Sequence, residues 1–321
     1  MVAGRAHARS ATTADRRPRR RSGSGLGRRG EIAFFLTPAI LLYVVFVIYP
    51  ITRAGQYSFY RWNGLQDLTD FIGFQNYREA ITNSVFQGAL MNNLTIIIAS
   101  LVVQLPIGLG IALLLNRKLK GRGALRTIIF IPYVLAEVVA GVMWTLILTP
   151  RGAANATLQN LGLENLQQLW LADPDIALWT LFGVLTWKYV GFAIILFLAG
   201  LQGVPEELHE AAALDGASWW QIQRRIVIPM IGPTIRIWAF LSMIGSIQLF
   251  DLVWIMTGGG PANSTQTMAT YLIGQGFERF RFGYGSAVAV IMFSFSLILA
   301  LFYQRFVLAR DVQDPVSGRK G

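Results

Sequence analysis

Apolar residues occur along this chain in long runs that short polar segments separate. Six of the runs come close to the twenty or so apolar residues that a helix needs to cross the hydrocarbon core of a membrane. We expect spans at residues 32–51, 89–115, 127–149, 176–201, 237–257 and 285–303. Because a backbone inside lipid must satisfy its own hydrogen bonds, the runs predict helices, and the chain is predicted to be an all-α polytopic membrane protein.

Composition supports a membrane protein. Hydrophobic residues make up 54% of the 321 residues and charged residues only 14%, whereas soluble domains carry about 25% charged residues. The chain has no cysteine, which excludes disulfides, thiolate metal sites and cysteine nucleophiles. Its two histidines, His7 and His209, do not have the spacing of a metal-ligand pair.

The domain organisation follows from where the apolar runs begin and end. We expect a disordered, arginine-rich tail at 1–31, a six-span membrane domain at 32–308 and a short tail at 309–321. The first apolar run is too long for a signal peptide and lacks a small-residue cleavage site, so we expect it to remain as a span.

The basic residues predict the orientation. Twenty Lys and Arg lie in the two tails and in the 116–126 and 202–234 loops, against six in the opposite loops. The positive-inside rule then places both termini in the cytoplasm. The net charge of +11 is therefore interpreted as a topology signal, and we expect no nucleic-acid partner.

The loop at about 202–234 is the most informative polar segment. Pro205 suits the first position of a helix, and Gly216 suits a helix end in the left-handed conformation. Ser218 is a good N-cap for a second helix, which Pro229 should limit on its far side. The loop is therefore predicted to form two short helices joined at Asp215-Gly216.

This pair of helices has two interpretations. It is predicted to expose the apolar side chains of Leu208, Leu214, Trp219, Trp220 and Ile222. An amphipathic pair of this kind could lie on membrane lipid. The small alanines beside a tight glycine turn also suit insertion into a groove of a protein partner.

The same loop resembles a known signature. The matching residues are Glu210, Ala211, Ala212, Asp215, Gly216, Ala217, Ile226, Ile228 and Pro229. They resemble the EAA loop of permeases from binding-protein-dependent ATP-binding-cassette importers. The resemblance implies that the loop is a coupling helix seated in a cleft of an ATPase subunit. Trp220 stands where that family usually has another aromatic residue, often phenylalanine.

Further segments resemble the sugar-permease branch of that family, which includes maltose and glycerol-phosphate transporters. They are Thr37-Pro38, Tyr49-Pro50, Gly191-Phe192, Phe250-Asp251, the run 258–261 and the run 283–287. The resemblance implies the type I importer permease fold and transport of a carbohydrate by alternating access. It also implies a second, similar permease, two ATPase subunits and an external sugar-binding protein.

No enzyme signature is present in the sequence. The dipeptide Gly-Lys does not occur, so the chain has no phosphate-binding loop of the Walker A type. We therefore expect no cofactor on this chain, with ATP and magnesium bound by the ATPase partner.

Ionisable groups inside spans are the candidates for a substrate path, because they are costly in lipid and usually face a polar interior. Gln248, Asp251 and Trp254 should form one stripe of the fifth helix, offering polar groups and an aromatic plane to a sugar. Asp251 could equally be structural. Lys188 could line the path, but pairing with Asp251 or Glu137 is favoured.

The sequence is also compatible with two other classes of protein. A proton-coupled secondary transporter would use Glu137 or Asp251 as a relay, although the six spans show no internal repeat. A membrane scaffold would use the 202–234 loop for interaction alone, and the charges within the spans disfavour it.

Overall fold

The computed structural model describes residues 25–117 and 120–308. This part of the chain is mostly helical and has no β-strand, only an isolated bridge between Tyr60 and Phe71. The first helix begins at Gly25, so residues 25–31 are not a disordered tail. Helix elongation adds one hydrogen bond per residue, which lets the first span extend beyond its apolar run. The predictions for the rest of both tails lie outside the described residues.

The chain divides into two compact units, Met1–Thr52 and Arg53–Gly321. The first unit holds helix α1 (Gly25–Tyr43), the π-helical turn η1 (Val44–Ile48) and the start of α2 (Tyr49–Tyr57). Its side chains from Ile32 to Thr52 are exposed throughout. A helix that is apolar on all sides needs lipid or another protein to cover it.

The second unit holds the remaining helices. In chain order they are the remainder of α2, α3 (Gln75–Thr82), α4 (Ser84–Ala99), η2 (Ser100–Gln104), α5 (Leu105–Leu115), α6 (Arg122–Val134), α7 (Glu137–Ile147), α8 (Ala153–Asn160), η3 (Glu164–Leu166), α9 (Ala177–Leu201), α10 (Glu206–Leu214), α11 (Trp219–Ile222), η4 (Gln223–Val227), α12 (Ile228–Met230), α13 (Gly232–Ile247), α14 (Asp251–Met256), α15 (Met268–Ile273), η5 (Gly274–Glu278), α16 (Phe282–Tyr303) and η6 (Gln304–Leu308).

Six spans are present when bent pairs are counted. Four continuous helices of the described chain are long and apolar enough to cross a membrane: Ile32–Tyr57, Ser84–Leu115, Ala177–Leu201 and Phe282–Leu308. Two further candidate spans are helix pairs that bend at a short break, by 95° between α6 and α7 and by 66° between Trp219–Met230 and α13. The predicted all-α, multi-span architecture is confirmed.

The predicted third span is broken, because α6 ends at Val134 and α7 begins at Glu137. Leu135 and Ala136 between them have extended backbones. A helix end leaves carbonyl groups without helical partners. Here the ammonium group of Lys188 is the partner of one such carbonyl, since its Nζ donates to the Leu135 carbonyl at 2.6 Å.

The predicted fifth span, 237–257, is also wrong as a single helix. α13 starts earlier, with Pro233 in its first turn, and ends at Ile247. A break at residues 248–250 separates it from α14. Gln248 therefore does not share a helix with Asp251 and Trp254, and the predicted stripe of these three residues on one helix does not form.

Distant polar side chains stabilise the end of α13. Asn93 is fully buried and donates from Nδ2 to the Ser246 carbonyl at 2.6 Å. Its Oδ1 accepts from the Met268 backbone N–H at 2.9 Å, which connects α4, α13 and α15. Thr267 donates to the Leu249 carbonyl at 2.8 Å. These bonds satisfy backbone groups that a continuous helix would have paired internally.

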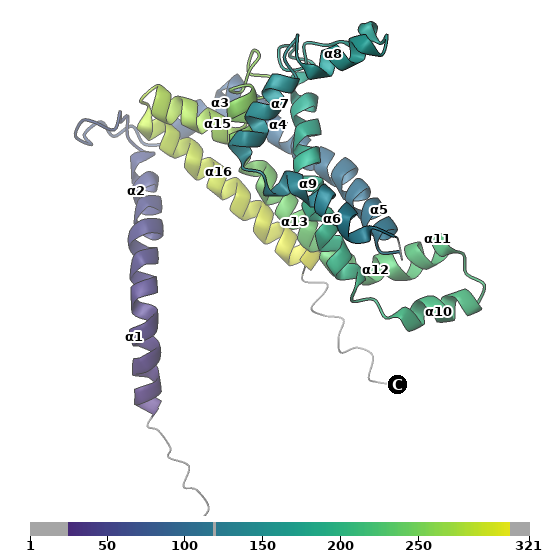
Figure 1. The fold of residues 1–321 in the computed structure, drawn as a ribbon. Coiled ribbons are helices and arrows are strands. Elements are labelled where there is room, and N and C mark those ends of the chain that lie inside the picture. Colours follow the sequence, from purple (N-terminus) through teal and green to yellow (C-terminus); the bar gives the residue numbers. More distant parts are fainter. Residues whose placement is uncertain (1–24, 118–119, 309–321) are drawn as a thin grey trace, which may run out of the picture. The chain divides into compact units, whose positions relative to one another are not determined.

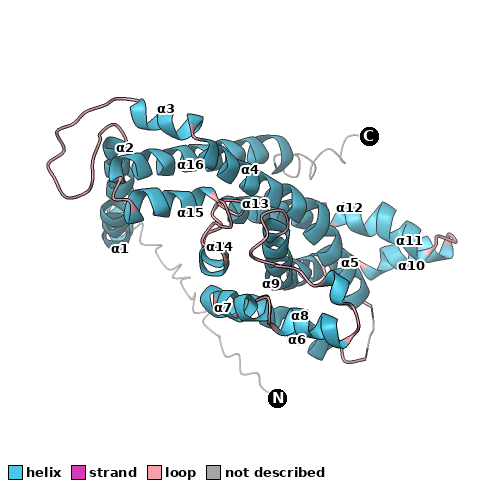
Figure 2. Ribbon diagram, turned by 90° about the horizontal axis from the view of Figure 1, so that it is seen from above, coloured by secondary structure: helices cyan, strands magenta, loops and turns pink. Residues whose placement is uncertain are grey.

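Within the second unit, α3, α8 and α15 lie at one end of the helical bundle, and α10 and α11 project from the other (Figure 1). Viewed from above, α13 lies between α9 and α16 (Figure 2). The contact of α13 with α9 includes Phe197 packed on Trp238, whose ring centroids are 5.7 Å apart. Because α13 lies at the centre of the bundle, it forms one wall of a cavity.

Candidate functional site

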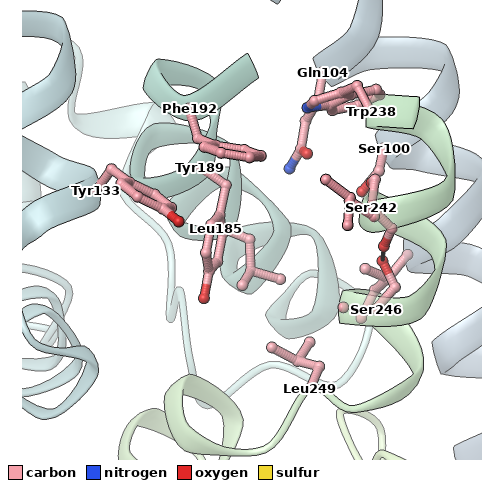
Figure 3. A pocket seen from close by; sticks show the side chains of 13 residues that line it. Ser100, Gln104, Tyr133, Leu185, Tyr189, Phe192, Trp238, Ser242, Ser246 and Leu249 are labelled. Carbon is pink, nitrogen blue, oxygen red and sulfur yellow. Dashed lines mark hydrogen bonds between the residues drawn. The ribbon is translucent and has the colours of Figure 1, made fainter. Parts of the chain in front are cut away.

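A cavity of about 300 Å³ lies between η2, α9 and α13, with a side contributed by α6 (Figure 3). Its lining residues are Ile96, Ser100, Gln104, Tyr133, Leu185, Tyr189, Phe192, Trp238, Leu241, Ser242, Gly245, Ser246 and Leu249. A volume of this size lies at the lower end of the range for small-molecule sites.

The π-helical turn η2 supplies two polar groups to the cavity. Ser100 and Gln104 are its first and last residues, and both line the cavity. Gln104 is nearly buried, and its Nε2 donates to Thr186 Oγ1 on α9 at 3.2 Å. Figure 3 shows its amide group directed into the open space. π-helical turns are rare and occur frequently at functional sites, because the wider turn redirects side chains.

Helix α13 forms a wall of small residues opposite α9. Ser242, Gly245 and Ser246 face the cavity at a spacing of three and four residues, which places them on one helix face. Ser246 Oγ donates back to the Ser242 carbonyl at 2.8 Å (Figure 3). The hydroxyl oxygen of Ser246 keeps its capacity to accept a hydrogen bond.

Aromatic rings from α6, α9 and α13 complete the cavity. Tyr133 stacks on Phe192 with ring centroids 5.1 Å apart and an angle of 19° between the ring planes. Tyr189 meets Tyr133 edge-on at 6.2 Å, and Trp238 contributes from α13. Hydroxyl and amide groups thus share one cavity with aromatic planes.

A charged cluster supports this aromatic wall. Tyr189 Oη donates to Glu137 Oε1 at 2.5 Å. Lys188 is 1% exposed, and its Nζ lies 3.7 Å from the same carboxylate oxygen. The favoured pairing of Lys188 with Glu137 is confirmed in the structure, whereas Lys188 and Asp251 form no ion pair. The cluster fixes the Tyr189 hydroxyl at the cavity edge.

The residues predicted for the substrate path are not in the cavity lining. Gln248 and Asp251 are exposed, and Trp254 stacks on Phe250 at 5.3 Å. Tyr189, which follows Lys188, and Leu249, which follows Gln248, line the cavity instead. Assignment of Gln248, Asp251, Trp254 and Lys188 to a substrate path stays a prediction.

Sequence reasoning missed Ser100, Gln104, Ser242 and Ser246, because they are uncharged. A signal was nevertheless present. The members of each pair are four residues apart within a predicted span, and this spacing places both on one helix face.

The local structure of the 202–234 loop matches its sequence signals. α10 and α11 are separate helices, and Gly216 between them has φ +79°, in the left-handed region. Ser218 forms the predicted N-cap as part of a capping box with Gln221, whose Oε1 accepts from the Ser218 N–H at 2.7 Å. The predicted turn at Asp215-Gly216 is confirmed.

Two details of this loop differ from the prediction. Ile222 is only 7% exposed and packs in a cluster with Ala212, Leu201 and Val227, so it is not part of the exposed surface. Pro229 does not end the helix, since helical backbone continues to Met230. The π-helical turn η4 precedes Pro229, and its wider geometry accommodates a ring that would clash with a regular α-helical turn.

The exposed face of the loop carries most of the signature residues. Glu210, Ala211, Asp215, Gly216 and Trp220 are exposed, whereas Ala212 is buried. Ala217 and Pro229 are half-buried and exposed, respectively. Arg117 stacks over the Trp219 ring at 5.6 Å, which ties the 116–126 loop to α11.

Comparison with known proteins agrees with these features. Residues 104–311 match the family described as the inner membrane component of binding-protein-dependent transport systems. A probable ABC transporter permease protein of Pyrococcus horikoshii is 35% identical over 85% of this chain and 94% of its own length. The sulfoquinovosyl glycerol transport system permease protein SmoG of Agrobacterium fabrum is 32% identical over 89% of this chain and 93% of its own length.

A solved structure has the same fold. It is a bacterial ABC transporter involved in the import of the acidic polysaccharide alginate, with a TM-score of 0.79 and 25% identity over 90% of this chain and 98% of the matched chain. The chain is thus a multi-pass membrane protein of a transport family whose members are permease subunits. It belongs to the family of inner membrane components of binding-protein-dependent transport systems.

Proposed function

We propose that this chain is one permease subunit of an ATP-driven carbohydrate importer. The cavity between η2, α9 and α13 would form part of the path that the sugar takes across the membrane. The observation that carries the proposal is the lining of that cavity. Ser100, Gln104, Ser242 and Ser246 offer groups that pair with sugar hydroxyls, and Tyr133 and Phe192 offer planes for sugar C–H faces. The similarity to permeases of glycoside and polysaccharide importers supports the same substrate class.

The coupling loop supports an ATPase partner. α10 and α11 project from the bundle end opposite α8, and exposed residues around the Gly216 turn leave this surface open for a partner. We infer that the loop docks in a groove of an ATPase subunit, which binds ATP and magnesium. The complete importer would contain a second permease, two ATPases and an external sugar-binding protein. Both termini of this subunit would lie on the cytoplasmic side of the inner membrane.

Proton-coupled transport finds less support. Glu137, which with Asp251 was one of two relay candidates, accepts a hydrogen bond from Tyr189 and lies beside the Lys188 ammonium group. Both contacts lie within the chain, so the carboxylate is held by the helix packing around the break between α6 and α7. The family membership likewise favours the importer.

The test is reconstitution of the whole importer in proteoliposomes with its binding protein. Uptake of labelled disaccharides from a panel and the rate of ATP hydrolysis are measured together. We expect sugar-loaded binding protein to stimulate hydrolysis and uptake to depend on ATP, while the purified chain alone shows no hydrolysis. Uptake that follows a proton gradient without ATP would overturn the proposal.

A further inference from the structure

A second groove runs along α6, beside α9. Its volume is about 390 Å³. Its lining residues are Arg126, Thr127, Phe130, Ile131, Val134 and Leu135 of α6 and its end, and Ile195 of α9.

The sequence of α6 builds this groove from two parallel rows of side chains. Residues four apart are neighbours on a helix surface. One row is Arg126, Phe130 and Val134, and the other is Thr127 and Ile131, with Leu135 just beyond the end of the helix. The rows extend about 12 Å along the helix at 1.5 Å per residue. Ile131 and Val134 are 51% and 68% exposed, so the groove is open in this chain.

Arg126 gives the groove a charged end. Its Nε is buried and has no hydrogen-bond partner among the described residues, and no ion pair to its side chain occurs there. A buried guanidinium nitrogen without an acceptor is costly, which points to a ligand that supplies one.

The two described helices that line the groove offer no anion for that role. Neither α6 nor α9 contains Asp or Glu. The segment before Arg126 adds positive charge, since Arg117, Lys120 and Arg122 are all exposed there. The remaining lining is apolar except for Thr127. A ligand complementary to both ends has an anionic head and a hydrocarbon tail.

We propose that this groove binds one anionic phospholipid, with its phosphate on Arg126 and an acyl chain along Phe130, Ile131 and Val134. The guanidinium group supplies several N–H donors to phosphate oxygens. Basic pockets between membrane helices near a bilayer surface are suited to anionic headgroups. The site would be filled from the membrane. It adjoins the cavity wall, because the ring centroid of Phe130 lies 5.3 Å from that of the cavity residue Tyr133.

The experiment measures lipid bound to the intact importer after purification from nanodiscs that contain phosphatidylcholine and phosphatidylglycerol. Native mass spectrometry counts the phosphatidylglycerol retained per complex. Arg126→Gln is compared with Arg122→Gln, which removes the same charge from an exposed site outside the groove. We expect Arg126→Gln to weaken retention about fivefold and Arg122→Gln to change it little.

A second variant keeps the charge and fills the groove. Ile195→Trp should also displace the lipid. It tests lipid binding in the groove if the importer with Arg126→Gln fails to assemble. Equal retention by both groove variants and the unmodified importer would overturn the proposal. So would equally tight retention of phosphatidylcholine, or a photo-crosslinker at Val134 that reacts with a partner permease and not with lipid. None of these readouts depends on which substrate is transported.

Discussion

The Nζ atom of Lys188 lies 2.6 Å from the carbonyl oxygen of Leu135, at the break between α6 and α7. The same ammonium group donates to the Pro132 carbonyl at 3.4 Å and lies 3.7 Å from Glu137, the first residue of α7. One cation in the middle of α9 thus satisfies the end of one helix and the start of the next. Lys188 thereby holds the bend that places Tyr133 at the cavity.

Replacement of Lys188 by methionine should destabilise the importer. The change leaves the Leu135 carbonyl and the Glu137 carboxylate without their cation, and we expect a loss of roughly 2 kcal/mol. Thermal melting of the purified complex measures it, with Lys120→Met, an exposed lysine, as the control. The double variant Lys188→Met/Glu137→Gln should recover part of the loss. A melting temperature of the single variant equal to that of the control would contradict this role.

Gln104→Ala should reduce sugar uptake while the complex still assembles and hydrolyses ATP at its basal rate. The substitution removes an amide that faces the cavity, and one lost hydrogen bond of about 1 kcal/mol corresponds to roughly fivefold weaker uptake at low sugar concentration. Gln159→Ala, an exposed position on α8, is the matched control. Unchanged uptake at normal complex yield would exclude Gln104 from the path.

Asn93→Leu should destabilise the packing of α4, α13 and α15. It preserves approximate volume but leaves the Ser246 carbonyl and the Met268 N–H unpaired in a buried site, at a cost of roughly 2 kcal/mol. Thermal melting of the complex is compared with that of Asn160→Leu, where the side chain is exposed. If both variants melt alike, the three-way connection is not a significant source of stability.

Gly216→Asp should impair coupling to the ATPase. A side chain at φ +79° costs about 1 kcal/mol of backbone strain. An added Cβ meets nothing within 4 Å in this chain, so steric damage would have to arise in the partner groove. Gly162→Asp is the control, because Gly162 also has positive φ and open space. Affinity capture of the ATPase and sugar uptake are measured in the same membranes.

Charge reversal at Glu210 separates the two interpretations of the loop. If the loop docks in an ATPase, Glu210→Lys should weaken capture or uncouple hydrolysis from uptake. If the loop lies on anionic lipid, the added positive charge should leave transport intact. Full capture and full uptake in both Glu210→Lys and Gly216→Asp would refute the coupling role.

The orientation can be tested with reporter fusions. Fusions after Gly321 and in the 116–126 loop should report the cytoplasm, because twenty of the basic residues flank that side. Fusions near Gly152 and Pro261 should report the outside. An external signal at Gly321 would contradict the six-span topology.

The sequence alone determined the features that depend on neighbouring residues. Long apolar runs identified the membrane helices, since lipid demands both length and internal hydrogen bonding. Gly216 and Ser218 identified the turn and the cap of the 202–234 loop, because positive φ and capping are properties of a few adjacent residues. Both features are present in the structure.

Only the tertiary structure decided where helices break and where the cavity lies. Only a few charged or amide residues, Glu137, Gln248 and Asp251, occur within the apolar stretches around Leu135 and Gln248, so the pattern predicts continuous helices at both places. A helix in lipid can break only where other groups satisfy the backbone that it releases. Lys188, Asn93 and Thr267 do so from positions distant in the chain, and their contacts, not the local sequence, direct Tyr133, Tyr189 and Ser246 to one cavity.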